Sequence, residues 1–234
     1  MYSGATAYRC YEGFCYEGFG YRADPPGSEM MRITNVESIV LQYDMDEPLG
    51  YAQGYYHQRT AHLVRIDTDE GLSGIGEIFG AGNVAFANQA IVRHVLAPLL
   101  TGRNPLDVNA IWHDLYNHLR DHGQKGMPIA SISGLDIALW DILGKSTGLP
   151  LYQLLGGKCR DDYVAYGYGM MFQKRDDLEE SYAAEARRIV EMGFRALKMK
   201  IGMGVARDTS LATAVQLAAG NGGPADDAAA VQWL

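Results

Sequence analysis

The chain has 234 residues, of which 47% are hydrophobic and 21% are charged, and this is an ordinary composition for one large or two modest globular domains. Its net charge of −8 gives no basic footprint for nucleic acid or for an anionic membrane. Three cysteines cannot build a disulfide framework. No apolar run reaches the roughly 20 residues that span a bilayer, and no signal peptide pattern opens the chain, so we expect a cytoplasmic protein.

Residues 1–30 show neither helical nor strand periodicity. The five residues 10–14 are repeated at once as 15–19, which spaces two cysteines as Cys-x4-Cys. A single pair of this kind is weak evidence for a zinc site. We therefore expect a disordered or non-native leader before a natural start near Met30 or Met31.

Three segments rich in β-branched and apolar residues predict strands at residues 33–43, 60–69 and 72–79. The last two are separated by Asp69-Glu70-Gly71, which is typical of a tight hairpin. Glycines at positions 71, 74, 76, 80 and 82 do not have the spacing of a nucleotide-binding loop, and they do not open a helix. A nucleotide site is therefore not expected here.

The connection at residues 44–59 is long for a compact domain, and it carries Tyr51, Tyr55, Tyr56 and His57. Long loops in compact domains often act as lids over functional sites. The alternative is a tyrosine-rich surface loop. The residues alone leave both interpretations open.

Apolar residues spaced three and four apart predict helices at residues 87–100, 105–119 and 128–145. Pro128 suits the first turn of the last helix, and Gly148-Leu149-Pro150 ends it. Asp141 and Lys145 are four residues apart on this helix. We expect this pair to give surface support only.

The pattern changes after residue 157. Residues 163–168 predict a strand, residues 177–192 a helix and residues 195–202 a second strand. This order is a β-α-β unit, which implies parallel strands and a right-handed crossover.

The second of these strands places Lys198 and Lys200 on one face, because successive side chains of a strand alternate. Each of two close ammonium groups disfavours the charge of the other. One lysine could therefore lose its proton near neutral pH and act as a base. The alternative is an edge strand with two solvated lysines.

Three stretches in this order resemble one family: residues 133–142, the turn at residues 148–157, and Lys198-Met199-Lys200. Residues 31 to about 207 are similar to the mandelate racemase/muconate lactonizing enzyme family of the enolase superfamily. The resemblance implies an α+β capping domain at residues 31–157, followed at residues 158–207 by the start of a TIM-type (β/α) barrel. Catalytic groups of such barrels stand at the carboxyl ends of strands.

The resemblance also implies a chemistry. Lys200 would remove the proton from the carbon next to a substrate carboxylate, and Lys198 would assist it and help to hold the carboxylate. Mg²⁺ would stabilise the resulting enediolate. The segment carrying Tyr51, Tyr55, Tyr56 and His57 would close over the site and bind the substrate. The expected substrate is a small carboxylate such as an acid sugar or an α-hydroxy acid. Racemisation, dehydration (a lyase reaction) and cycloisomerisation are all left open, as is a homo-oligomer.

The end of the chain departs from the family pattern. Residues 208–234 contain no Lys or Arg, and Asp226 and Asp227 are the only acidic residues near the place where the next barrel strand would end. We expect an atypical tail after about residue 207, from truncation or a frameshift. An incomplete barrel of two strands and an absence of metal ligands would follow. The chain itself would then be an inactive fragment of an enzyme family. The alternative is a non-catalytic interaction or oligomerisation module.

Overall fold

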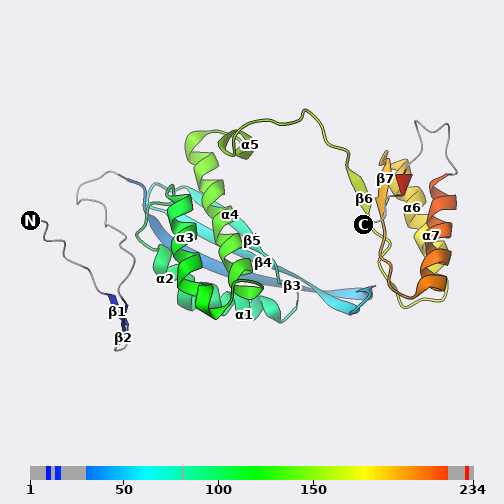
Figure 1. The fold of residues 1–234 in the computed structure, drawn as a ribbon, viewed down its shortest axis with the longest axis horizontal. Helices are drawn as coiled ribbons and strands as arrows, with labels where there is room; N and C mark the ends of the chain where they lie inside the picture. The colour runs from blue at the N-terminus through cyan, green and yellow to red at the C-terminus, as the bar shows by residue number, and fades with distance from the viewer. Residues whose placement is uncertain (1–8, 12–13, 17–29, 81, 221–229, 232–234) are drawn as a thin grey trace, which may run out of the picture. The chain divides into compact units, whose positions relative to one another are not determined.

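The computed structural model describes residues 9–11, 14–16, 30–80, 82–220 and 230–231 (Figure 1). The contacts divide the chain into two compact units. Unit 1 comprises Met1–Leu41 and Ala61–Leu154, and unit 2 comprises Gln42–Thr60 and Leu155–Leu234. Two long strands, β3 (Ile33–Tyr51) and β4 (Gly54–Thr68), contribute residues to both units.

Part of the predicted leader has regular structure. Strands β1 (Arg9–Tyr11) and β2 (Phe14–Tyr16) pair in antiparallel fashion. Both are rich in aromatic residues, which favour strands. The expectation of disorder therefore does not describe these six residues, and the rest of the leader lies outside the described residues.

The sheet of unit 1 has the strand order β3-β4-β5, with β5 at Ser73–Ile78. Strands β4 and β5 are antiparallel, and their register runs from His62 opposite Ile78 to Asp67 opposite Ser73. The Thr68 amide donates a hydrogen bond to the Leu72 carbonyl at 3.0 Å across the turn. The predicted hairpin is confirmed.

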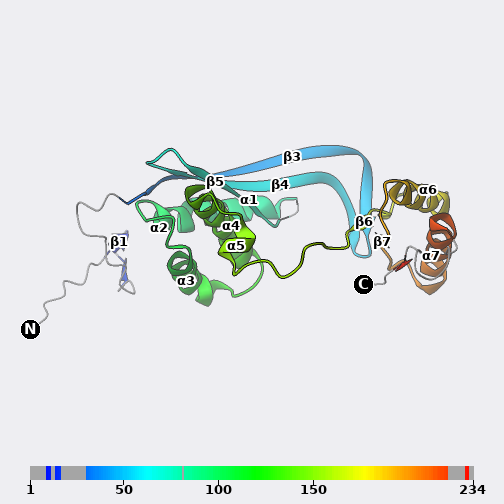
Figure 2. The ribbon, with the colours of Figure 1, turned by 90° about the horizontal axis from the view of Figure 1, so that it is seen from above.

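The predicted long loop at residues 44–59 is wrong. Strand β3 continues to Tyr51, β4 begins at Gly54, and a two-residue turn joins them. The two strands lie side by side along this extension (Figure 2). The acidic residues and the proline after residue 43 hide the alternating pattern of a half-buried strand. Pairing between neighbouring backbones satisfies the amide and carbonyl groups whatever the side chains are.

Helices pack on one face of this sheet (Figure 2). The first runs without a break through α1 (Val84–Ile91), the π-helical η1 (Val92–Leu96) and α2 (Ala97–Leu100). The others are α3 (Val108–Leu119), the short η2 (Arg120–His122), α4 (Met127–Thr147) and α5 (Leu151–Leu154). The three predicted helices are confirmed, with ends that differ by three residues or fewer.

Glycines let α4 lie directly against β5. A Cβ atom at Gly76 would lie 1.9 Å from the Gly134 carbonyl oxygen, and one at Gly74 would lie 2.0 Å from the Ala138 carbonyl oxygen. No side chain fits at either position, so these glycines have a packing role. Fully buried residues on α4 include Leu135, Ala138 and Ile142.

Asp141 and Lys145 do more than the predicted surface support. The Asp141 carboxylate accepts hydrogen bonds from the Ile75 amide at 2.9 Å and from Lys145 Nζ at 2.7 Å. Lys145 Nζ also donates to the Ser73 carbonyl at 2.7 Å. Strand β5 is the edge of its sheet, so the pair satisfies backbone groups that an unpaired edge would leave open.

By length and composition, α4 could cross a membrane, and it is the one helix of the described residues that passes this test. No such segment was expected from the sequence. Core helices of soluble proteins pass the same test, and α4 buries one side against β5 and neighbouring helices. Its packing therefore accounts for its apolar composition.

Unit 2 contains β6 (Tyr166–Tyr168), α6 (Leu178–Glu191), β7 (Ala196–Lys198), α7 (Val205–Ala219) and β8 (Ala230–Val231). Strands β6 and β7 are parallel, which confirms the predicted β-α-β unit. Strand β8 also pairs with β7 in parallel, so the expectation of two strands is wrong. The free edge of β7 offers backbone groups that even a two-residue strand can satisfy.

Helix α6 covers one face of β6 and β7. The predicted helix is confirmed, and its apolar residues Leu178, Tyr182, Ala186 and Ile189 are all buried. Arg207 on α7 forms an ion pair with Glu179 on α6. Leu211 and Val215 of α7 pack with the buried residues of α6, and together they form a second, smaller core.

Candidate active site

The two lysines lie at the carboxyl end of β7. Lys198 is the last residue of the strand, and its carbonyl accepts a hydrogen bond from the Gly169 amide at 3.3 Å. The Lys200 amide donates to the Met170 carbonyl at 3.1 Å. The pairing therefore continues past the ends of both strands and fixes the backbone at Lys200.

The opposite face of β7 turns inward only in part. Leu197 is buried in the core that α6 also lines, whereas Ile201 is 42% exposed. Ile201 lies beyond the strand, so the alternation no longer places it against α6.

Two tyrosines that the sequence analysis did not select lie beside the lysines. Lys198 Nζ lies 5.1 Å from the centre of the Tyr168 ring and 5.6 Å from that of Tyr166. Lys200 Nζ lies 5.6 Å from the Tyr168 ring centre. All three distances are within the range of cation–π attraction. The sequence feature that could have identified these tyrosines is the alternation Tyr166-Gly167-Tyr168. It becomes informative only once the register of β6 with β7 is known.

The tip of the β3–β4 hairpin docks next to β6 within unit 2. The Gly50 amide donates to the Phe172 carbonyl at 2.6 Å, and the Phe172 amide donates to the Gly50 carbonyl at 3.1 Å. The Tyr55 ring packs against the core of unit 2 and lies 5.0 Å from Lys174 Nζ. These contacts hold the tip in place.

Tyr51 and Tyr56 stack on each other at the tip, with ring centres 5.2 Å apart and planes 10° apart. A side-chain hydrogen bond with Tyr51 and partial burial raise the pKa of Tyr56, and the charge of Arg59 opposes this shift. A nearby Tyr168 adds to the increase in pKa. Tyr56 is thus a neutral phenol near neutral pH, and it can donate a hydrogen bond.

The four predicted substrate-binding residues do not act as one group. Tyr51 and Tyr56 stack on each other, whereas Tyr55 packs into the core of unit 2. His57 is exposed on the tip. Tyr55 and His57 are two residues apart on β4, so they share the strand face opposite to that of Tyr56.

The described residues do not fit a magnesium site. They contain no group of three or more His, Cys, Asp or Glu side chains that could hold a metal ion. The acidic groups near the strand ends bind backbone amides: Glu185 accepts from Met170 at 2.6 Å, and Asp208 accepts from Gly202 and Met203. Asp226 and Asp227 lie outside the described residues.

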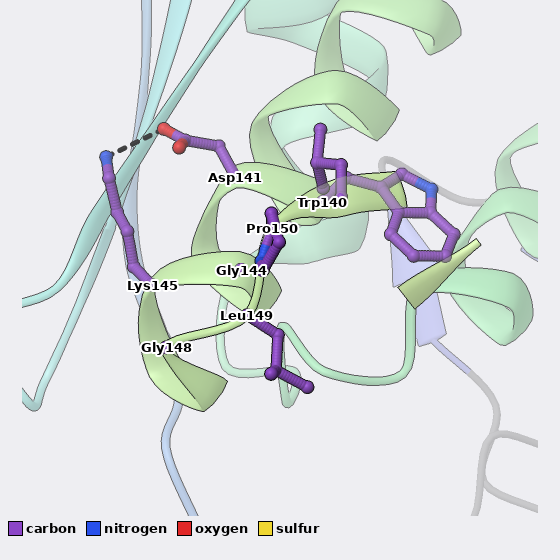
Figure 3. Close-up of a pocket in the computed structure, with 8 residues that line it drawn as sticks. Trp140, Asp141, Gly144, Lys145, Gly148, Leu149 and Pro150 are labelled. Atoms are coloured by element: carbon purple, nitrogen blue, oxygen red, sulfur yellow. Dashed lines mark hydrogen bonds and ion pairs between the residues drawn. The ribbon is translucent and has the colours of Figure 1, made fainter. Parts of the chain in front are cut away.

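A shallow hollow of about 480 Å³ lies at the carboxyl end of α4 in unit 1 (Figure 3). Trp140, Gly144 and Leu149 line it beside the Asp141–Lys145 ion pair. The polar groups at its rim already bond to each other and to β5. None of the residues that line it is among the predicted site residues.

The fold and the site define a class of protein: an α+β domain followed by a parallel β-α-β unit that carries a lysine pair at the end of a strand. Residues 35–156 match the N-terminal domain of the mandelate racemase / muconate lactonizing enzyme family. The chain belongs to this family of the enolase superfamily.

Relatives match across both units. The chain is 38% identical over 190 residues to D-galactarolactone cycloisomerase of Agrobacterium fabrum, a match that covers 81% of this chain and 49% of the relative. It is 38% identical over 141 residues to D-mannonate dehydratase of Rhizorhabdus wittichii, with 60% and 33% covered. A crystal structure of an enolase superfamily member from Polaromonas sp. JS666 aligns with a TM-score of 0.72 and 33% identity, covering 81% of this chain and 49% of that one. The chain thus spans about half the length of the first relative and of the aligned structure.

Proposed function

We propose that this chain supplies the capping domain and the proton-abstracting lysines of an enzyme that acts on a small carboxylate. In this proposal, β6 and β7 are the first strands of a (β/α) barrel. The observation that carries it is the placement of Lys198 and Lys200 at the carboxyl end of β7, where barrel enzymes keep their catalytic groups. Family membership supports the substrate class, since the family acts on small carboxylates.

The two lysines take different parts in the proposed reaction. The neutral amine of Lys200 accepts the proton from the carbon next to the substrate carboxylate. The ammonium group of Lys198 attracts that carboxylate and stabilises negative charge as it develops. Tyr51 and Tyr56 at the hairpin tip limit the access of water and contact the substrate, and the neutral phenol of Tyr56 can donate a hydrogen bond to it.

Members of this superfamily combine such a base with one or two Mg²⁺ ions that stabilise the enediolate. The described residues of this chain provide no ligand set for the ion. We therefore assign no step to Mg²⁺ here, and we propose that these 234 residues do not catalyse the reaction alone.

A chimera tests this function. Residues 31–207 would be joined to the second half of D-galactarolactone cycloisomerase and incubated in D2O with Mg²⁺ and D-galactarolactone. Exchange of the substrate α-proton is followed by NMR. The expected result is exchange by the chimera, its loss in Lys200→Ala, and its retention in Lys125→Ala, which alters an exposed lysine of unit 1. A folded chimera in which Lys200→Ala exchanges at the unaltered rate would contradict the assignment.

The second candidate is a folded module without catalysis. The observation that favours it is that the described residues assemble no metal ligands. It predicts that the chain binds no Mg²⁺ and that the chimera shows no exchange. Calorimetry that detected tight Mg²⁺ binding by the 234 residues would count against this candidate.

A further inference from the structure

Two tyrosines and two lysines lie near one another at β6 and the end of β7: Tyr166, Tyr168, Lys198 and Lys200. Tyr168 lies opposite Lys198 in the strand register, and Tyr166 lies opposite Ala196. Lys198 Nζ is near both rings, at 5.6 Å from the centre of Tyr166 and 5.1 Å from that of Tyr168. Among the described rings, Lys200 Nζ is near that of Tyr168, at 5.6 Å. The two lysines differ in this respect: one has two aromatic neighbours, and the other has one.

Aromatic rings accompany these ammonium groups. Neither Lys198 nor Lys200 forms an ion pair or a side-chain hydrogen bond within the described part of the chain. Among the described residues, the titratable groups that lie beside them are the phenols of Tyr166 and Tyr168. Glu185 and Asp208 are bound to backbone amides instead. The rings are thus the described groups that can distinguish one lysine from the other.

Glycines fix the rings on this face. A Cβ atom at Gly167 would lie 2.0 Å from Ile189 Cγ2, and one at Gly169 would lie 2.3 Å from Glu185 Oε1. Helix α6 therefore presses against the glycine side of β6. The side chains of Tyr166 and Tyr168 must point to the other side, where both are 48% exposed.

We propose that Tyr166 and Tyr168 are positioning residues that decide which lysine acts as the base. A ring attracts an ammonium group through its electron-rich face, and a neutral amine forgoes this attraction. Lys198 lies within reach of two rings, so its ammonium group gains this attraction from both. Lys200 lies within reach of one ring, gains less of this attraction and takes the part of the base. This inference rests on the proposed function of the lysine pair, and it adds a physical reason for the division of roles.

Competitive acetylation tests the proposal on the full 234-residue chain. Trace acetic anhydride is added at about pH 7, and mass spectrometry gives the labelling of each lysine relative to the exposed Lys125. Tyr166→Leu should increase the labelling of Lys198 about two- to fivefold and leave Lys200 unchanged. Tyr168→Leu should increase both. Tyr166→Phe and Tyr168→Phe keep the ring and should label like the natural chain.

A second condition separates charge from shielding. At about pH 11 lysine amines are largely neutral, so labelling reports access alone. The gain of each leucine variant over its phenylalanine counterpart should shrink there. Tyr163→Leu is the matched control, because Tyr163 is 76% exposed and precedes β6. Hydrogen exchange at the amides of Gly169 and Lys200 checks that the strand pairing persists.

Three results would overturn the proposal: unchanged labelling in Tyr168→Leu, equal gains at both pH values, or gains in the phenylalanine variants. None of them touches the proposed function, which the loss of exchange in Lys200→Ala tests separately. Conversely, a chimera without exchange would leave the labelling pattern in place. The two ideas can therefore fail independently.

Discussion

Unit 1 and unit 2 both combine strands with helices, but they differ in the size of the hydrophobic core and in the side chains on the strands. The hydrophobic core of unit 1 has 17 buried residues and that of unit 2 has 9 among the described residues, so unit 1 has the larger core. Unit 2 instead keeps tyrosines and lysines on an open strand face. The scaffold of this chain is therefore concentrated in unit 1 and its candidate chemistry in unit 2.

The largest expected effect is a loss of stability from a substitution that disrupts the packing of unit 1. In Gly76→Ala the new methyl group meets the Gly134 carbonyl at 1.9 Å, and backbone on α4 or β5 must move. We expect a loss of about 3 kcal/mol in the free energy of unfolding. Urea denaturation followed by the fluorescence of Trp112 and Trp140 measures it.

Gly54→Ala is the matched control, because a Cβ atom there has nothing within 4 Å. A change below about 0.5 kcal/mol is expected for it. Equal stability losses in the two variants would show that the contact between α4 and β5 is not as close as described.

Acid should weaken unit 1 through His62. Its ring is fully buried and hydrogen-bonded to Ser38 Oγ at 2.7 Å. Burial first, and then the charge of Arg93, lower the pKa of His62. The unfolded chain therefore binds a proton below about pH 6.5 that the folded chain does not, and stability falls with pH by up to about 1.4 kcal/mol per unit.

Unfolding measured between about pH 8 and pH 5 shows this slope. His62→Gln should flatten it, whatever its effect on overall stability. His94→Gln changes an exposed histidine and should leave the slope as it is. A slope that survives in His62→Gln would assign the acid sensitivity to another group.

A smaller effect is expected at the edge of β5. Asp141→Ala removes the acceptor of the Ile75 amide and the partner of Lys145. We expect a loss of about 1 kcal/mol, which exceeds that of an ordinary surface pair because a backbone group is left unsatisfied. Arg187→Ala, which breaks an exposed pair with Glu180 on α6, should cost almost nothing. Equal losses of stability in the two variants would show that the Asp141–Lys145 pair gives surface support only.

The smallest expected effect has the opposite sign. Tyr182 is buried in unit 2, and its hydroxyl has no hydrogen-bond partner among the described residues. Tyr182→Phe should therefore leave the stability of unit 2 unchanged or increase it by about 1 kcal/mol. Hydrogen exchange of the α6 amides measures it. Faster exchange in the variant would reveal a partner for the hydroxyl.

Most of unit 1 could be predicted because residues close together in the sequence indicate each of its elements. The stripe on α4, Gly148 after its last turn and the Asp69-Glu70-Gly71 turn each fix an element within a few residues of sequence. The extension of β3 and β4 could not be predicted in this way. Its residues near Asp44 and Pro48 show no alternation, and only pairing between the two strands makes them extended.

The sequence predicts the lysines of the candidate site in unit 2 but not the tyrosine beside them. Lys198 and Lys200 stand out because two cations two residues apart share a strand face. Tyr168 did not stand out, because its importance depends on the register of β6 against β7, which lie about 30 residues apart in the chain. Register between distant strands is a property of the fold, and no local pattern contains it.

Chemical rescue is the sharpest test of Lys200 as the base. In the chimera, Lys200→Cys removes the proposed base, and alkylation with 2-bromoethylamine restores an amine of nearly the same length. We expect α-proton exchange to be lost in Lys200→Cys and to return after alkylation. The treated chimera that retains Lys200 controls for modification of other cysteines, such as the exposed Cys159. Complete alkylation without recovery of exchange would contradict the assignment of Lys200 as the base.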